Sequence, residues 1–359
     1  MPRQTLLDPT KTGRSAEDLE NQLRHFVVGQ EEAVHEIVRT YQTHLTGLSP
    51  AGRPIGNFLF LGPTGTGKTR IVEATAGFLL KDPRAVIKVD CAEFQHSHEI
   101  AKLIGSPPGY LGHRETHALL SQEALDRQHT DKRKLSFVLF DEIEKASDAL
   151  WNLLLGILDK GILTLGDNCK VDFSATMIFM TSNLGAAEMS SLVSPRLGFQ
   201  GPSLENPGCQ EKLSARISRT GVAAARQKFT PEFINRLDKI VVFKSLGNEE
   251  LRRIVDIELE MVHQRIQTAA AGKPFLLNVT DSARELLLRE GTDVRYGARP
   301  LKRAIERLLV QPLSNLMATG QIQRGDRIRV THSDGSASLK FFREAGGLED
   351  REMAGRAAA

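Results

Sequence analysis

The sequence is poor in cysteine, tryptophan and tyrosine. Its 359 residues include three cysteines, one tryptophan and three tyrosines. Cys91, Cys169 and Cys209 are odd in number, lie far apart and form no C-x-x-C pair. This pattern argues against both a disulfide framework and a thiolate zinc site. We therefore expect a reducing compartment and, with no signal-peptide core between Met1 and Arg14, a cytoplasmic protein.

Long apolar runs and an excess of one charge sign are also missing. No stretch approaches the ~18 apolar residues that a membrane-spanning helix needs, so we predict no membrane association. The 47 basic and 44 acidic residues leave a net charge of +3, which does not call for nucleic acid as the main partner. With 40% hydrophobic and 25% charged residues, the composition is that of a soluble globular protein, and the length allows two domains.

One glycine-rich stretch fits the phosphate-binding pattern G-x-x-x-x-G-K-[ST] at every required position. The apolar residues 57–61 before it predict a buried strand, and apolar residues recur at helical spacing after it. In that context we expect the loop N–H groups and Lys68 to bind the phosphates of a nucleotide, and Thr69 to hold Mg²⁺. The predicted loop comprises Gly62, Pro63, Thr64, Gly65, Thr66, Gly67, Lys68 and Thr69.

Two further apolar runs end in polar side chains suited to the same chemistry. Residues 137–140 lead into Asp141 and Glu142, and residues 176–181 lead into Ser182 and Asn183. In a parallel sheet these strand ends face the phosphate loop, because ligands bind outside the carboxyl ends of the strands. We expect Asp141 to hold Mg²⁺, Glu142 to orient or deprotonate the attacking water, and Asn183 to position that water.

The pattern of the chain changes near Ser245, from alternating strands and helices to mainly helices. We predict an N-terminal segment over 1–22, a nucleotide-binding domain over 23–245, a helical lid over 246–343 with one small strand pair, and a disordered tail over 344–359.

Three local features of this outline are more specific. Ser15, with Asp18 three residues on, is predicted to cap a helix that ends near Phe26. Residues 190–228 are expected to be an irregular connection, because proline and glycine interrupt them. The lid's third helix is expected to run from about Gly297 to Thr319 with a bend at Pro312.

Two pairs of histidines have spacings that invite a metal assignment. His113 and His117 stand at i and i+4, but no acidic third ligand in an H-E-x-x-H arrangement accompanies them. His96 and His98 also lack such a partner. We predict solvated or partly packed histidines at all four positions.

Taken together, the motifs resemble the AAA+ ATPases of the Clp unfoldase group, in particular the second ATPase module of ClpA, ClpB and ClpC. The resemblance runs from about His25 to Val330 and implies an α/β P-loop fold of the AAA+ class followed by a helical lid. It makes the loop the Walker A motif, Asp141-Glu142 the Walker B motif and Asn183 sensor 1.

The resemblance also implies roles that no local pattern would suggest. Arg236, in Pro-Glu-Phe-Ile-Asn-Arg-Leu-Asp, matches the arginine finger that reaches a neighbouring subunit's nucleotide, and Arg299, in Gly-Ala-Arg-Pro, matches the sensor-2 arginine. Other matching positions are the adenine-packing Val27 and Val28, and Tyr110 with Leu111 in the pore loop that grips a threaded polypeptide.

The implied function is ATP-dependent unfolding or remodelling of proteins by a ring, a homo-oligomer of hexamer type. The alternative is an AAA+ motor or loader that remodels DNA, although an aromatic between glycines in the pore loop favours peptide over nucleic acid. Leu197-Gly198-Phe199 resembles the tip by which family members dock on a ClpP-like peptidase; it could equally fold back on its own domain.

The sequence departs from the family's pattern in two ways. The family's N-terminal domain, first ATPase module and coiled-coil insertion have no counterpart, which implies a single-ring machine and speaks against autonomous disaggregation. After Gly166, Asp167-Asn168-Cys169-Lys170 replaces the usual second glycine and arginine, so we expect different contacts from this loop.

Overall fold

The computed structural model describes residues 8, 11–106, 118–130, 133–193, 207–269, 275–292, 297–333 and 338–344. They belong to two compact units, Met1–Ser245 and Leu246–Ala359. No helix in the described ranges is both long and apolar enough to cross a membrane. Several positions singled out in the sequence lie outside the described residues: Tyr110, Leu111, His113, His117, Leu197, Gly198 and Phe199.

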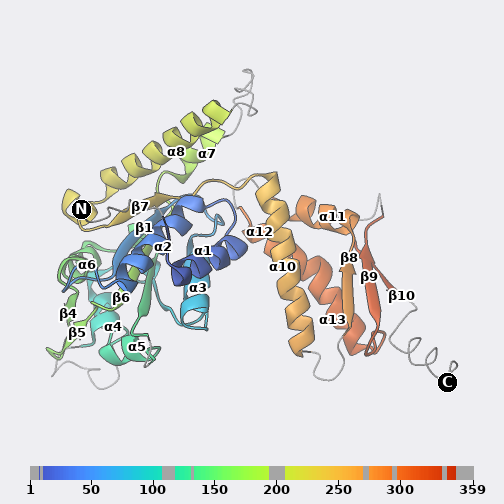
Figure 1. Cartoon of the computed structure of the whole chain (residues 1–359), viewed down its shortest axis with the longest axis horizontal. Helices are drawn as coiled ribbons and strands as arrows, with labels where there is room; N and C mark the ends of the chain where they lie inside the picture. Colours follow the sequence, from blue (N-terminus) through green and yellow to red (C-terminus); the bar gives the residue numbers. More distant parts are fainter. Residues whose placement is uncertain are drawn as a thin grey trace, which may run out of the picture. The chain divides into compact units, whose positions relative to one another are not determined.

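A five-stranded parallel sheet forms the centre of the first unit (Figure 1). Its strand order is β2-β3-β6-β1-β7, and each neighbouring pair is parallel. The near-continuous apolar sequence of the central strands is what a sheet covered on both faces requires. The strands are β1 Gly56–Leu61, β2 Ile87–Asp90, β3 Ser136–Asp141, β6 Thr176–Ser182 and β7 Lys239–Val242.

Each face of this sheet carries its own core, because successive side chains of a strand point to opposite sides. Phe58 and Phe60 of β1 pack with α1 (Arg14–Phe26), α2 (Glu31–Leu45) and α3 (Lys68–Leu79). Leu59 and Leu61 belong to the other core, with α6 (Asp148–Lys160) and α8 (Pro207–Lys228).

The predicted cap at the first helix is wrong. Helix α1 begins at Arg14, with Gly13 as its N-cap and no side-chain cap hydrogen bond. Ser15 therefore lies within the first turn of the helix. A capping side chain belongs to the residue just before the helix, and that position is occupied by Gly13. Burial of Ala16, Leu19 and Leu23 holds this helix on the sheet instead.

The prediction of an irregular connection over 190–228 is also wrong where the structure describes it, since α7 (Ala186–Val193) and α8 occupy most of that range. Ile217 and Ala225 are buried at helical spacing in α8. Gly221 lies between them, where an added Cβ would come within 3.2 Å of Val242. The glycine therefore permits close packing of a helix on the sheet and does not end the helix.

Shorter elements complete the first unit. An antiparallel pair, β4 and β5, surrounds Asn168, which has a left-handed backbone with φ of 66°. The remaining elements are η1 Cys91–Glu93, η2 Ser97–Ile100, α4 Ala101–Ile104, α5 Gln122–Asp126, η3 Ile143–Lys145, β4 Ile162–Thr164, β5 Lys170–Asp172 and α9 Pro231–Ile234.

The second unit combines helices with a three-stranded sheet of order β10-β9-β8. The predicted pair β9 and β10 is present and antiparallel, and β8 adds a third strand parallel to β9. The elements are α10 Asn248–Ala269, β8 Leu276–Val279, α11 Asp281–Gly291, α12 Arg299–Ile305, α13 Gln311–Ala318, β9 Arg327–Thr331 and β10 Lys340–Glu344.

The helix expected to bend at Pro312 changes its winding just before the proline. A π-helical segment, Glu306–Val310, joins α12 to α13, and Pro312 stands in the first turn of α13. Proline has no N–H and its ring clashes with the carbonyl four residues earlier. A wider turn at this point accommodates the ring without breaking the helix.

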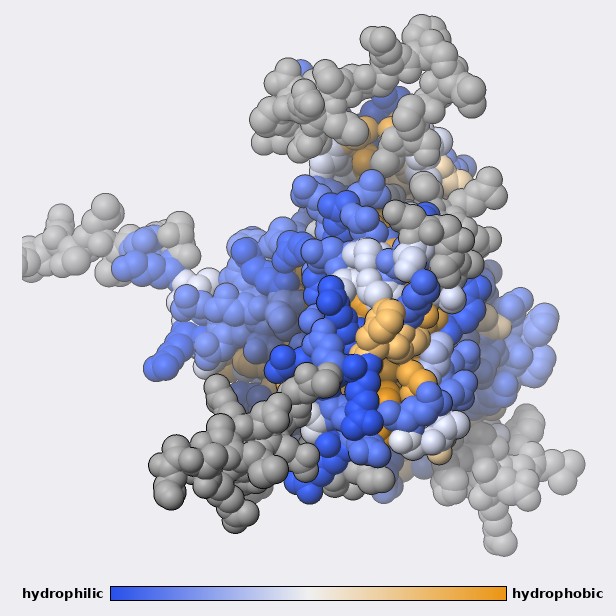
Figure 2. Space-filling model, turned by 90° about the vertical axis from the view of Figure 1, so that its right-hand side faces the viewer, coloured by the Kyte–Doolittle hydropathy of each residue, from blue (hydrophilic) through white to orange (hydrophobic). Residues whose placement is uncertain are grey.

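The side of the molecule shown in Figure 2 is mostly hydrophilic and has an apolar area near its centre. Half-exposed apolar side chains of the second unit include Leu276 on β8 and Phe342 on β10.

Candidate nucleotide-binding site

Three loops meet at the carboxyl edge of the first unit's sheet. The phosphate loop follows β1. Asp141 is the last residue of β3 and Glu142 comes directly after it, while Asn183 directly follows β6. Strand β6 lies between β1 and β3, so Asn183 stands between the other two loops. The strand order thus brings together the side chains that the motifs predicted would meet.

The phosphate loop depends on backbone conformations that glycine adopts without strain. Gly62, Gly65 and Gly67 have φ of 144°, 78° and 101°. A Cβ added at Gly62 would lie 2.5 Å from the carbonyl oxygen of Phe243. Helix α3 begins at Lys68, so the N-terminal end of its dipole points at the loop. The loop is built to hold an anion at this helix end.

Lys68 is 8% exposed and lies folded over the loop. Its Nζ donates to the carbonyl oxygens of Gly62 at 2.7 Å and Pro63 at 2.9 Å, and to Oδ1 of Asn183 at 3.0 Å. These contacts hold the ammonium of Lys68 at the N-terminal end of α3. A cation at this helix end is suited to bind phosphate.

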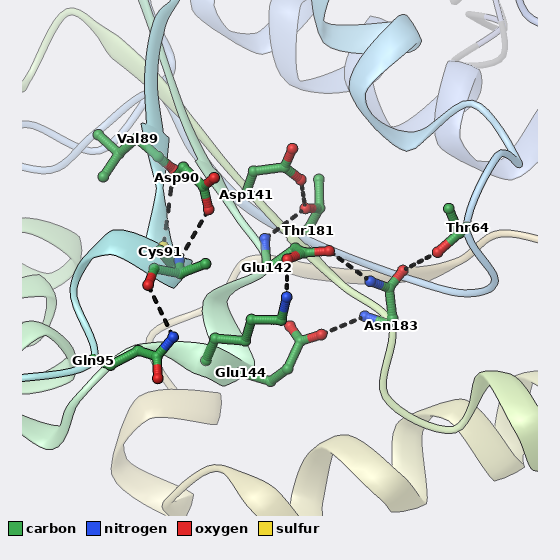
Figure 3. Close-up of polar contacts among 12 residues, drawn as sticks. Thr64, Val89, Asp90, Cys91, Gln95, Asp141, Glu142, Glu144, Thr181 and Asn183 are labelled. Carbon is green, nitrogen blue, oxygen red and sulfur yellow. Dashed lines mark hydrogen bonds and ion pairs between the residues drawn. The ribbon is translucent and has the colours of Figure 1, made fainter. Parts of the chain in front are cut away.

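The two carboxylates at the end of β3 are held by different partners (Figure 3). Thr181 donates its hydroxyl to Oδ1 of Asp141, and its Oγ1 accepts the main-chain N–H of Glu142 at 3.1 Å. Glu142 has a left-handed backbone with φ of 56°, which is uncommon for a residue with a side chain. Such strain concentrates at functional sites, where the surrounding contacts maintain it.

Both carboxylate oxygens of Glu142 have partners. Oε2 forms an ion pair with Lys145, and Oε1 accepts from Nδ2 of Asn183 at 3.3 Å. The pKa of Lys145 is raised, mainly by its hydrogen bond to Glu142 and next by the negative charge of the Glu142 carboxylate. Glu142 is therefore oriented towards Asn183, and through it towards the phosphate loop.

The donor set fits Mg²⁺ at the positions that the sequence indicated. Thr69, in the first turn of α3, offers a hydroxyl, and Asp141 offers a carboxylate. Both are hard oxygen ligands of the kind Mg²⁺ takes together with phosphate oxygens. Within the described residues no group of three histidine, cysteine or acidic side chains could hold a metal by itself. His96 and His98 instead stack on each other, with 5.7 Å between ring centres.

Comparison with protein families agrees with this geometry. A model described as "AAA domain (Cdc48 subfamily)" matches residues 53–240, and one described as "C-terminal, D2-small domain, of ClpB protein" matches residues 246–330. The chain belongs to the AAA family of ATPases. The resemblance to the second ATPase module of the Clp unfoldases is confirmed.

Named relatives of this AAA protein are ClpB chaperones. It is 39% identical to chaperone protein ClpB of Rhizobium meliloti (strain 1021) over 328 residues, which is 91% of this chain and 34% of that protein. ClpB of Brucella suis biovar 1 (strain 1330) is 40% identical over 323 residues, covering 90% and 34%. The chain thus spans about a third of the length of these relatives.

Solved structures of Hsp104 have the same fold. A closed-state reconstruction with ATPγS and FITC-casein superposes with a TM-score of 0.74 at 30% identity, covering 93% of this chain and 53% of that one. The extended S. cerevisiae Hsp104–casein complex gives a TM-score of 0.75 at 31% identity, with 92% and 53% covered. The predicted AAA+ fold class, an α/β unit followed by a mainly helical one, is confirmed.

The AAA site includes one residue that the sequence motifs did not single out. Gln30 is 4% exposed and donates from Nε2 to the carbonyl oxygens of Thr66 at 3.3 Å and Lys244 at 3.0 Å. Its Oε1 accepts the main-chain N–H of Lys244 at 3.0 Å. Gln30 therefore ties the phosphate loop to the end of β7. A polar residue directly after the apolar Val27-Val28-Gly29 was the available signal.

Val27 and Val28, the residues expected at the adenine, are each 4% exposed. Val27 lies beside the phosphate loop, since its Cγ1 is 4.0 Å from the position of a Cβ built on Gly67. An apolar surface therefore adjoins the loop at this point.

The two arginines of the resemblance belong to different units of the chain. Arg236 pairs with Glu232 at 2.8 Å and approaches Asp159 at 3.9 Å. Its side chain is 23% exposed. Arg299 is exposed at the start of α12 in the second unit. Arg236 therefore has acidic neighbours within the first unit.

Proposed function

We propose that this chain hydrolyses ATP at the carboxyl edge of the first unit's sheet and uses the turnover to unfold or remodel protein substrates. One observation carries the catalytic part: Asn183 joins Lys68 of the phosphate loop to Glu142 at the end of β3. The residue that binds phosphate and the residue suited to activate water are thus fixed relative to each other in a single chain.

Each residue of the site has a part in this proposal. The loop Gly62–Thr69 cradles the phosphates, and Lys68 neutralises the outermost ones. Thr69 and Asp141 would hold Mg²⁺, which supplies charge neutralisation at the phosphate oxygens. Glu142 accepts the proton of the attacking water while Asn183 orients that water, and Val27 and Val28 pack against the adenine.

The named relatives support a protein substrate. They are called chaperones, and the two Hsp104 structures contain casein. We propose that the chain forms a hexameric ring and that Tyr110 and Leu111 contact the polypeptide in its pore. In this ring Arg236 completes a neighbour's site, and Arg299 contacts nucleotide. The relatives' names favour remodelling without degradation over docking of a ClpP-like peptidase at Leu197-Gly198-Phe199. The unpaired Cys91 and Cys169 agree with a cytoplasmic location.

The decisive test measures phosphate release and nucleotide binding by the full chain. Wild type should turn over ATP faster when casein is added. Lys68→Ala should lose nucleotide binding because the phosphate counter-charge is gone. Glu142→Gln should bind normally and turn over at least about 100-fold more slowly, because the shape is kept and the base is lost.

Lys160→Ala, an exposed lysine at the end of α6, is the matched control and should behave as wild type. Equal loss of affinity in Lys68→Ala and Glu142→Gln would contradict the assigned roles. Stimulation by DNA in place of casein, with a steep dependence on salt, would favour the nucleic-acid motor.

A further inference from the structure

Glu144 connects the end of β3 to the end of β6. It lies in the short turn η3, two residues after Glu142, whose backbone is left-handed. Its Oε1 accepts the main-chain N–H of Asn183 at 3.0 Å (Figure 3). The carboxylate therefore reaches from one catalytic loop to the main chain of the next.

Asn183 is the residue through which this contact reaches the site. Its Oδ1 accepts from Lys68 Nζ at 3.0 Å and from Thr64 Oγ1 at 3.3 Å. Its Nδ2 donates to Oε1 of Glu142 at 3.3 Å. The amide side chain is polar at both ends and must be held in one orientation for both contacts to form.

Glu144 is well placed to hold that orientation. Among the described residues, no other side chain bonds to the main chain of Asn183. The second oxygen, Oε2, is buried and has no hydrogen-bond partner in the described part of the chain. Burial of a half-satisfied carboxylate opposes folding, so the presence of Glu144 here points to a role in the site and not to stability.

We propose that Glu144 is a positioning residue for ATP hydrolysis. It fixes the main chain of Asn183, which places the Asn183 amide between Lys68 and Glu142 and so sets the base carboxylate against the terminal phosphate. The inference rests on the proposed function and deepens it. Proton transfer stays with Glu142, because one oxygen of Glu144 is engaged with a main-chain N–H and the other is buried.

The test compares Glu144→Ala and Glu144→Gln in the full chain. Glu144→Ala should lower kcat by about 10- to 100-fold, since small displacements of reacting groups have effects of that size. The affinity for a fluorescent ADP analogue should stay within about threefold of wild type, because the phosphate loop is unchanged. Glu144→Gln should retain kcat within about threefold, because its amide oxygen still accepts from Asn183.

Two controls separate positioning from other roles. Glu93→Gln makes the same chemical change at an exposed position of η1 and should leave kcat and the melting temperature unchanged. In an Asn183→Ala background, Glu144→Ala should lower kcat by less than about twofold further, since the side chain through which it acts is already absent.

Several results would overturn the inference. A Glu144→Gln protein as inactive as Glu142→Gln would make Glu144 a proton-transfer group. If the kcat losses of Glu144→Ala and Asn183→Ala multiplied fully in the double variant, Glu144 would act independently of Asn183. If Glu144→Ala lowered the melting temperature and lost ADP affinity, its role would be structural. A wild type that binds ATP without turnover would refute the proposed function itself, and the inference with it.

Discussion

Cys91 lies directly behind the carboxylates of the AAA site, at the end of β2. Its thiol is fully buried and donates weakly to the carbonyl oxygen of Val89. Burial raises the pKa of the Cys91 thiol strongly, and the negative charges of Asp141, Asp90, Glu144 and Glu142 raise it further. The thiol stays protonated in the folded protein under conditions in which an exposed cysteine ionises.

This raised pKa predicts a loss of stability in alkali. Above the ordinary thiol pKa of about 8.5 the unfolded chain loses the proton while the folded protein keeps it, so the unfolding free energy falls as the pH rises. The fall from this residue approaches about 1.4 kcal/mol per pH unit. Cys91→Ala removes that contribution.

The measurement is urea-induced unfolding between pH 7.5 and 10, followed by fluorescence of Trp151, the one tryptophan, which lies in the first unit. Samples contain a reductant and no nucleotide. The difference in unfolding free energy between wild type and Cys91→Ala should shrink with rising pH. Parallel curves for the two proteins would show that Cys91 does not titrate in this way.

At this scale the sequence predicted the residues with a strict motif and missed those without one. Asn183 contacts both Lys68 and Glu142 as expected, because the segments that carry these residues follow parallel strands that end at one edge of the sheet. Gln30 belongs to no motif, and its only local signal is its position directly after Val27-Val28-Gly29. Its function arises from contacts with Thr66 and Lys244, and the latter is 214 residues away. The sensor and finger roles of Arg236 and Arg299 stay predictions.

The phosphate loop and β7 form a tight contact that depends on Gly62. A Cβ there would meet the carbonyl oxygen of Phe243 at 2.5 Å, and the φ of 144° is one that other residues rarely adopt. Gly62→Ala should therefore lower the unfolding free energy of the first unit by about 2–4 kcal/mol. Urea unfolding followed by Trp151 fluorescence measures the change.

Gly47→Ala provides the matched comparison. Gly47 has a φ of 71° with nothing within 4 Å of an added Cβ, so only backbone strain of about 1 kcal/mol is expected. If both variants lost the same free energy, the close approach of β7 would have no measurable effect and backbone strain alone would account for Gly62.

The elements that were predicted correctly share a strong apolar signal. Strands β1, β3 and β6 are short runs of apolar residues, and such runs are enough to predict a buried strand at each position. Helix α8 was missed because its glycine and hydroxyl residues have low helix propensity, and packing of Ile217 and Ala225 overrides that preference. The π-helical segment before Pro312 depends on how the helix packs, which periodicity does not report.

At the scale of the whole molecule, the position of Arg236 suggests a test of whether neighbouring chains share a nucleotide site. Within one chain its guanidinium pairs with Glu232 and lies near Asp159, outside the catalytic cluster. If it completes a neighbour's site, Arg236→Ala should bind ATP normally and hydrolyse it slowly. Mixing that protein with Glu142→Gln should restore part of the roughly 10³–10⁵-fold that an arginine finger contributes, since some interfaces then pair an intact Glu142 with an intact Arg236.

The readout is phosphate release as a function of the mixing ratio. Co-purification of differently tagged chains establishes that mixed assemblies form. A linear sum of the two separate activities at every ratio would show that Arg236 does not act on a neighbouring site.

The strand order β2-β3-β6-β1-β7 also has a consequence for how the protein is made. Both neighbours of β1 come from much later sequence: the main-chain N–H of Asn57 donates to Asp238, 181 residues further on. During synthesis the phosphate loop leaves the ribosome early, but β6 and β7 are still to be translated. Until they arrive, Phe58 and Phe60 remain exposed on an unpaired strand, a state that favours aggregation. We therefore expect the nascent chain to depend on the cell's chaperones before it can hold a nucleotide.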